Sequence, residues 1–518
     1  MRHKIVIATA ILLLGIIGCN EDFLNLENQN SYTEDSYFTT ASQLQESVVA
    51  AYCGFYQIGL FAREWYFYHD MLGNDAKAAP AMVGTGSMGQ LPALSYDGTN
   101  SEIQNLWRSL YRIVLRSTIA IDKSNEFTPT TTDETTVKNN TVGEASFLKA
   151  WSYFTLYRLW GVIPLRKTID DMAINDFARA GTEQEVVDYI LEVLKDAEAD
   201  LPVSWSTANK GRVTRGAAIA LRGQLYLWQK SYALAEAEFA KLATTPYSYA
   251  LAPKFSDNNT EAGDNNVESL FEVQHAYNKS GSVWYMFGSQ EYGVAQAVTG
   301  RAMEYGFNDW FNVYVSNSCV ESFKYTINEH SYVDPRAFYT FYGNAASGGD
   351  TTYYSATAAN NEQSYPFATK GYAWKKYQRY ETQEKEGKPC SPINTRVLRY
   401  ADVLLMRAEC MIQTGNTSGA LTLINQVRER SGAEKYTSLG STPMTILKRE
   451  RRLELSGEQV RFFDLIRWGE LVSTLNPEKS AQSEGTPYQE KHNKFPITTD
   501  ELDINKKMTN SVYYSGWN

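Results

Sequence analysis

Residues 218–246, AIALRGQLYLWQKSYALAEAEFAKLATTP, decide the fold class of this chain. Gly223 stands where a small residue lets two helices approach each other, and Tyr226 follows three residues later. Ala235 is the next small contact position, and Phe239 is placed to fill the seam between the helices. Because these contact positions return at helical spacing, the stretch predicts a closely packed helical hairpin.

A second copy of this pattern lies far downstream, in residues 404–432, LLMRAECMIQTGNTSGALTLINQVRERSG. Both copies match tetratricopeptide spacing, although Pro246 falls one residue early in the first. Two such hairpins cannot bury their faces alone, so we expect other helices to stack with them. The alternative is two unrelated helix pairs. The equivalent positions in the second copy are Ala408, Met411, Gly415, Ala420 and Ile424.

The remaining periodicity separates a helical scaffold from a loop-rich region. Apolar residues recur at helical spacing in residues 40–59, 102–124, 142–161 and 182–202. Residues 247–395 lose this period and are rich in Gly, Asn, Ser, Tyr and Trp, with a strand-like segment at 269–277. We therefore predict an all-α fold in which tetratricopeptide-like hairpins form a scaffold, with a long loop-rich region and minor β-hairpins. Because long loops in a compact domain are usually functional or disordered, we expect binding to take place there.

The first residues have the pattern of a bacterial lipoprotein signal. A short basic lead precedes thirteen apolar residues, 5–17, which is the length of a secretory segment and too short to span a membrane. Ile16-Ile17-Gly18-Cys19 is similar to a lipobox, so we expect cleavage after residue 18 and acylation of Cys19. An ordinary signal peptide with a chance cysteine is the alternative. The acidic residues after Cys19 fit either a surface-export signal or a solvated tail.

Composition narrows the class of ligand. The formal net charge of −10 argues against nucleic acid as a partner, since nucleic acid requires basic stripes. No CxxC motif occurs, so a zinc cluster is not expected, and the cysteines after residue 19 are either free or include one bridged pair. The chain holds 35 tyrosines and 11 tryptophans, residues that combine an apolar face with a polar group. This bias favours a neutral ligand with faces on which aromatic rings stack.

Several segments together resemble the SusD/RagB family of outer-membrane nutrient-binding lipoproteins. The segment EDFL after Cys19 is similar to the start of that family. Residues 143–165, GEASFLKAWSYFTLYRLWGVIPL, resemble its central motif, and residues 399–432 resemble its C-terminal repeat. Residues 446–471 resemble the charged helix that follows, and 494–508 resemble the closing segment, although the final YYSGWN departs from the usual ending.

The resemblance implies a cell-surface glycan-binding protein without catalytic activity or cofactor. Such a protein is anchored in the outer membrane by the lipid on Cys19 and acts as a lid on a SusC-like, TonB-dependent transporter. A peptide ligand is the alternative within the family. The resemblance also implies residues 1–18 as signal peptide and 19–518 as a single domain. Within it we expect a helical part at about 35–246, a loop-rich insert at about 247–395, and the C-terminal repeat with its charged helix at about 396–518.

Two stretches have the mixture of residues that a sugar site needs. Sugars present a flat C–H face to aromatic rings and hydroxyls to paired hydrogen bonds, so a site requires exposed Trp or Tyr beside Asp, Asn or Arg. Residues 63–78 and 280–311 both supply this mixture, and in the family the ligand loops fall in comparable regions. The candidate ligand-binding residues are Trp65, Tyr66, Tyr68, Asp70, Asn74, Asp75, Trp284, Tyr285, Tyr292, Arg301, Tyr305 and Trp310. Core packing is the alternative for each aromatic, and we assign Trp107, Trp151, Trp160 and Trp468 to the core.

A surface glycoside hydrolase is the rival function, since it also needs aromatics and a pair of carboxyl groups. Glu450, Glu454 and Glu458 lie four apart among arginines, but this spacing on a helix is more typical of a salt-bridge lattice than of a catalytic pair. No GxSxG, HExxH or GxxxxGK[ST] stretch occurs, and five scattered histidines do not predict a metal site. The acidic stretch 257–266 leaves calcium as an alternative without EF-hand spacing.

Overall fold

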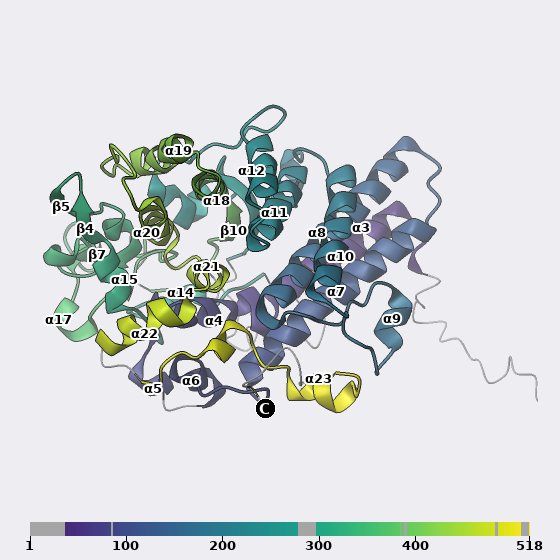
Figure 1. The fold of residues 1–518 in the computed structure, drawn as a ribbon, viewed down its shortest axis with the longest axis horizontal. Helices are drawn as coiled ribbons and strands as arrows, with labels where there is room; N and C mark the ends of the chain where they lie inside the picture. Colours follow the sequence, from purple (N-terminus) through teal and green to yellow (C-terminus); the bar gives the residue numbers. More distant parts are fainter. Residues whose placement is uncertain are drawn as a thin grey trace, which may run out of the picture.

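The computed structural model describes residues 37–83, 86–277, 297–383, 385–387, 391–481, 485–508 and 517. Figure 1 shows long helices on one side, two helical hairpins in the middle, and short strands with loops on the other side. This arrangement confirms the prediction of a helical scaffold that carries a loop-rich region. Within the ranges just given, no helix is both long enough and apolar enough to cross a membrane.

The first helical layer is built around two long neighbouring helices, α7 and α8, against which α3 and α10 pack. Helix α8 begins at a capping box formed by Thr131 and Glu134 and ends at Gly161, whose φ of 72° lies in the left-handed region. Thr182 caps α10 by accepting a hydrogen bond from the backbone N–H of Glu185. The helices of this part are α3 Ala41–Tyr52, α4 Trp65–Leu72, α5 Pro80–Val83, α6 Gly86–Ala93, α7 Ser101–Glu126, α8 Thr132–Trp160, α9 Ile169–Ala173 and α10 Glu183–Asp200.

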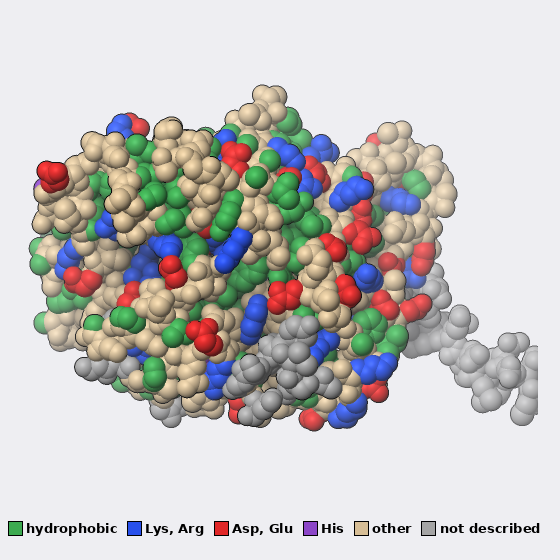
Figure 2. All heavy atoms as spheres, viewed as in Figure 1, with side chains coloured by type: hydrophobic (Ala, Val, Ile, Leu, Met, Phe, Trp, Pro, Cys, Tyr) green, Lys and Arg blue, Asp and Glu red, His purple; other side chains and the backbone are tan. Residues whose placement is uncertain are grey.

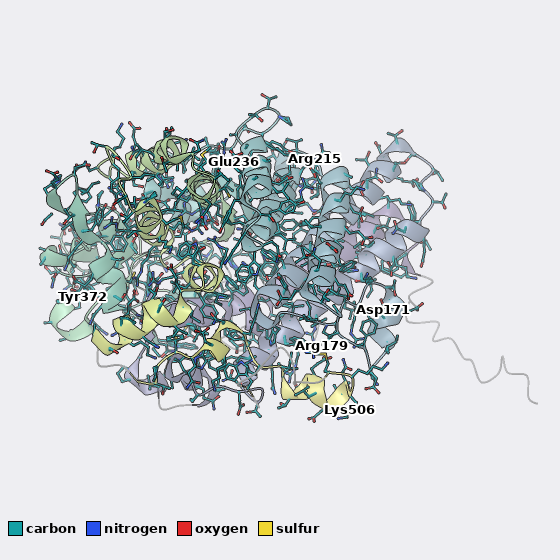
Figure 3. The ribbon with its side chains drawn as sticks, viewed as in Figure 1. Asp171, Arg179, Arg215, Glu236, Tyr372 and Lys506 are labelled. Carbon is teal, nitrogen blue, oxygen red and sulfur yellow. The ribbon has the colours of Figure 1, made fainter. Side chains whose placement is uncertain are left out.

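The two predicted hairpins are present and lie side by side. They consist of α11 Arg215–Trp228 with α12 Tyr232–Lys241, and α18 Tyr400–Gln413 with α19 Thr417–Arg430. Helix α12 packs on α18, and Arg407 pairs with Glu236, labelled in Figure 3, at 2.9 Å across that contact. A Cβ atom at Gly223 would lie 2.5 Å from the ring of Phe239, so only glycine permits this helix approach. Helix α11 also packs on α10 and contacts α8, and α18 packs on α11 of the first hairpin, which confirms the expected stacking.

The loop-rich part is closed by a strand pair at its base. Strands β2 and β10 run antiparallel, with Val273 opposite Thr395, so the two ends of the insert meet. Its elements are β2 Ser269–Val273, α14 Arg301–Tyr305, β3 Val313–Val315, α15 Asn317–Ser322, β4 Lys324–Ile327, β5 His330–Val333, α16 Ala337–Thr340, β6 Phe341–Tyr342, β7 Thr352–Tyr354, β8 Glu362–Ser364, α17 Phe367–Lys370, β9 Ala373–Trp374 and β10 Thr395–Arg399. Strand β3 pairs with β1 Ala76–Ala78, which ties the insert to the N-terminal part.

The C-terminal helices hold a buried network of charged side chains. These helices are α20 Pro443–Leu455, α21 Arg461–Trp468, α22 Leu471–Ala481 and α23 Thr499–Ile504. Glu454 contacts Arg399 at 2.7 Å and Arg336 at 3.1 Å, and it also pairs with Arg430. Glu458 contacts Arg399 and Lys376. The prediction that the glutamates of this segment form a salt-bridge lattice is confirmed, but their partners come from other elements rather than from the same helix.

Three cysteines are free thiols in the structure: Cys53 is partly buried, and Cys319 and Cys410 are buried. Cys19 and Cys390 lie outside the described residues. Charges of both signs are interspersed over the face drawn in Figure 2, without a basic stripe.

Candidate functional site: the Trp310 surface

The first predicted ligand-binding stretch is inside the protein. All eight residues of α4 are buried, with Trp65 6% exposed and Tyr66 and Tyr68 fully covered. Asp70, Asn74 and Asp75 are also buried, at 2%, 4% and 2% exposure. The expectation that this stretch forms an exposed aromatic arc is therefore wrong. The reason is that α4 is apolar or aromatic on nearly every face, and a helix of that kind belongs in a core.

The polar ends of these side chains bind other parts of the core. Asp70 accepts hydrogen bonds from the Tyr305 hydroxyl and from Gln459, both at 2.8 Å, and burial raises the pKa of Asp70 to about 6. Asp75 pairs with Arg452 at 2.9 Å. These residues join the N-terminal part to α14 and to the C-terminal helices. Because they are buried and paired within the protein, they are structural residues.

Arg301 and Tyr305, which we predicted to bind the ligand, also lie inside the protein. Both lie in α14 and are buried, at 3% and 1% exposure. The Arg301 guanidinium lies 3.4 Å from the ring centre of Tyr377 and 4.9 Å from that of Tyr66. Aromatic rings thus enclose Arg301, and such cation–π contacts are stronger when they are desolvated. The Arg301 side chain is therefore not accessible to a ligand.

The tryptophans assigned to the core are in place. Trp107, Trp151 and Trp160 are 4%, 2% and 0% exposed, which confirms their assignment. Trp468 is partly buried and donates from Nε1 to Glu409 at 3.0 Å, as a structural residue does. Trp284, Tyr285 and Tyr292 lie outside the described residues, so their role stays a prediction.

Trp310 alone among the described candidates is exposed, at 39%. It follows α14 in a tight turn, where its backbone N–H donates to the carbonyl of Met303 at 3.2 Å. The next residue, Phe311, has a φ of 52°, a conformation that non-glycine residues rarely adopt, and its ring is buried. The backbone therefore reverses between the two residues, which places Trp310 outside and Phe311 inside.

A chain of contacts links Trp310 to a second exposed ring, that of Tyr277, which is 44% exposed. The Arg379 guanidinium lies 4.8 Å from the Tyr277 ring centre and pairs with both oxygens of Glu386, at 2.7 and 2.8 Å. The backbone N–H groups of Glu386 and Gly387 each donate to Asp309 at 2.9 Å, and Asp309 precedes Trp310. We call Tyr277, Asp309, Trp310, Arg379 and Glu386 the Trp310 surface.

A small aromatic core holds this surface in place. The buried ring of Phe307 meets those of Tyr365 at 4.9 Å and Tyr380 at 4.6 Å. The Tyr380 hydroxyl accepts a hydrogen bond from the backbone N–H of Asn308 at 3.2 Å. The turn that carries Trp310 is therefore anchored on both sides, so a ligand would meet a preformed surface.

The exposed side chains of the Trp310 surface, Trp310 and Tyr277, are aromatic and are of the kind that stack on an uncharged polar ring. Trp310 and Tyr277 are exposed, whereas the Glu386 side chain is 2% exposed and paired with Arg379. Burial raises the pKa of Asp309, while the two backbone N–H groups lower it. Sequence reasoning found Trp310 and missed Tyr277, Asp309, Arg379 and Glu386. Only Asp309 carried a signal, through its position next to Trp310, because the others come from segments about 30 to 75 residues away.

In the part of the chain that the structure describes, no three His, Cys, Asp or Glu residues gather as metal ligands would. In the acidic stretch 257–266, Asp264 is paired with Arg396 at 2.8 Å, and Asp257 accepts from the backbone of Lys254.

Two family models match this chain and account for the resemblance noted in its sequence. The model of the SusD family matches residues 257–517, and a model described as starch-binding and associating with the outer membrane matches residues 22–227. The chain belongs to the SusD family. The predicted membership is thus confirmed, and the two matches cover both the N-terminal helices and the loop-rich part.

Relatives within the SusD family align along nearly the whole chain. SusD-like protein P38 of Formosa agariphila is 24% identical over 502 residues, which is 90% of this chain and 92% of that protein. A SusD superfamily structure from Bacteroides vulgatus has a TM-score of 0.74 at 24% identity, covering 91% of this chain and 99% of that one. The surface glycan-binding protein A of Bacteroides thetaiotaomicron, solved with laminarihexaose, has a TM-score of 0.71 at 21% identity, covering 91% and 99%. These structural matches establish the fold.

Proposed function

We propose that this SusD-family chain is a cell-surface lipoprotein that captures an oligosaccharide and delivers it to a SusC-like, TonB-dependent transporter in the outer membrane. The Trp310 surface is the observation that carries the proposal. Its exposed rings, Trp310 and Tyr277, are joined by polar groups and fixed on a small core of their own. A solved relative of the same fold holds laminarihexaose, which supports a glycan rather than a peptide as the ligand.

Capture without cleavage is the expected activity. A glycosidase needs one carboxyl group that protonates the leaving oxygen and a second that acts as nucleophile or base. At the Trp310 surface, both oxygens of Glu386 are taken by Arg379, and Asp309 accepts two backbone hydrogen bonds. Both carboxylates hold the loop together, so this surface supplies a platform for binding and no free acid and base pair.

A binding screen with a turnover assay tests the ligand. The lipid-free protein, beginning after Cys19, is titrated with plant, microbial and host oligosaccharides and with a peptide library, and each hit is incubated for cleavage products. We expect saturable glycan binding and no products. Cleavage would replace the proposal with a hydrolase, and binding of peptides alone would replace the cargo.

The anchor and the partner are tested in cells. We expect the full chain to fractionate with outer membranes and to co-purify with a large β-barrel transporter. Cys19→Ala removes the acylated thiol and should release the protein from the membrane, since acyl chains supply the anchoring free energy. Membrane retention of the Cys19→Ala variant would contradict the lipid anchor while leaving glycan binding open.

A further inference from the structure

A second hollow lies apart from the Trp310 surface and shares none of its residues. It is a groove of about 520 Å³, a size typical of small-molecule sites. Its walls come from the loop before α11, the segment after α12 and the approach to β2. Figure 3 labels Arg215, the first residue of α11, which follows the groove residue Thr214 in sequence. We call it the Trp205 groove, after one of the residues that line it.

The aromatic walls of the Trp205 groove are rigid. Trp205 is partly buried, and its Nε1 donates to the Val213 carbonyl at 2.7 Å. The rings of Tyr247 and Tyr249 are nearly parallel, 12° apart with centres 6.1 Å apart, and the Tyr249 hydroxyl lies 3.0 Å from Thr214 Oγ1.

Gly216 leaves room for the ring of Tyr249. A Cβ atom at Gly216 would lie 2.3 Å from the Tyr249 hydroxyl oxygen, so this position accepts no larger residue without displacing the ring. The groove is therefore a preformed set of aromatic faces, for which a ligand pays little ordering entropy.

The accessible charge of the groove is positive. Its acidic residue, Glu272, is 2% exposed and is occupied by the Asn265 backbone, the Asn394 amide and Arg396. Arg212 reaches the buried Glu144 through Nε at 3.2 Å. Lys210 is exposed, and no described carboxylate lies within ion-pair distance of it. In a chain of net charge −10, this groove thus pairs aromatic faces with cations.

We propose that the Trp205 groove is a second saccharide site, one that takes an oligosaccharide bearing anionic groups such as uronate or sulfate. A sugar ring stacks on Tyr247 and Lys210 attracts the acidic substituents, while Arg212 lies 5.4 Å from the Trp205 ring centre and pairs with Glu144. The flat aromatic ring of Tyr247 suits the C–H face of a sugar. Tyr247 and Lys210 both line the groove and carry polar groups that suit such contacts.

Calorimetric titration with charged and uncharged probes tests this site. The lipid-free protein is titrated with hexagalacturonate, a sulfated galactan hexasaccharide and uncharged laminarihexaose. We expect Lys210→Glu to weaken binding of an anionic probe at least tenfold, by reversing a charge that contacts the ligand, and Tyr247→Ala to weaken it about fivefold, by removing a stacking face. Raising the salt from about 0.05 M to about 0.5 M should also weaken it, since salt screens exposed charges.

Matched variants separate the Trp205 groove from the Trp310 surface. Trp310→Ala should leave binding of the anionic probe unchanged, and Lys210→Glu should leave binding of any uncharged glycan unchanged, with thermal midpoints equal to that of the parent. Binding of hexagalacturonate alone indicates a preference for uronate, and binding of the sulfated galactan alone indicates a preference for sulfate. The proposal is overturned if neither anionic probe binds, if Lys210→Glu binds them as the parent does, or if hexaglutamate binds equally well and loses affinity in the same variants.

Discussion

Glu454→Gln should destabilise the fold by removing a buried negative charge. Glu454 is fully buried on α20 and contacts Arg336, Arg399 and Arg430. Burial on its own would raise the pKa of Glu454, but the three guanidinium groups outweigh burial and hold the pKa well below its usual range. An amide of the same shape keeps the packing and removes the negative charge. Three buried cations then lose their shared partner.

The expected loss in the free energy of unfolding follows from the burial of the charged network around Glu454. Removing one partner of a buried ion pair lowers the free energy of unfolding by about 3–5 kcal/mol. An unfolding entropy of about 2.1 cal/mol/K per residue over about 500 residues is about 1 kcal/mol/K, so a loss of about 4 kcal/mol lowers the Tm by about 4 °C. Differential scanning calorimetry at neutral pH measures this shift.

A nearby exposed pair supplies the control. Glu429 pairs with Lys435 at 3.3 Å, and both side chains are more than half exposed. Glu429→Gln should therefore change the free energy of unfolding by less than about 0.5 kcal/mol. If Glu454→Gln shifts the Tm no more than Glu429→Gln does, the reasoning that the buried network stabilises the fold is refuted.

Three further predictions concern stability. Burial would raise the pKa of Glu458, but Arg399 and Lys376 lower it to about 2. Its contribution to the free energy of unfolding is therefore complete above about pH 4.5 and is lost as the pH falls toward 2. Urea unfolding from pH 6 to 3 should show a shallower decline in the free energy of unfolding for Glu458→Gln than for the parent. Burial raises the pKa of Asp70 to about 6, so its stabilising effect is complete below about pH 4 and is lost as the pH rises from about 4 through 6. Asp70→Asn should reduce the loss of stability between about pH 4 and 6.5, and an unchanged slope would count against it. Gly223→Ala should lower the free energy of unfolding by about 1–3 kcal/mol, because the new methyl group meets the Phe239 ring, and a stabilised variant would contradict the close helix approach.

The helical framework was predictable because its signals are local. Small residues such as Gly223 and Ala235 at fixed spacing mark the hairpins, and Thr182 marks the start of α10 through its own capping bond. The burial of Trp151 and Trp160 also follows from their place in a helical segment that is rich in apolar and aromatic residues. These features depend on residues a few positions apart, which sequence periodicity reports well.

The composition of the Trp310 surface depends instead on tertiary contacts. Trp65 and Trp310 both lie beside polar residues in sequence, yet one is in the core and the other is exposed, because α4 is apolar all round whereas Trp310 sits on a turn. Arg379 and Tyr277 meet only because the insert folds back on itself. Composition alone therefore identified the kind of residue that a sugar site uses and could not tell which of them reach the surface.

The affinity of the Trp310→Ala variant for the glycan found in the screen tests the central claim most directly. At 39% exposure, a ring of roughly 250 Å² offers about 100 Å², and stacking on one face covers about half of it. At about 25 cal/mol/Å² this contact contributes about 1.3 kcal/mol, or about tenfold in affinity. We predict that calorimetry shows a Kd about tenfold higher for Trp310→Ala and an unchanged Kd for Phe338→Ala, an exposed aromatic on α16 outside the Trp310 surface. Equal affinity of Trp310→Ala and the parent would contradict the assignment of glycan capture to this surface.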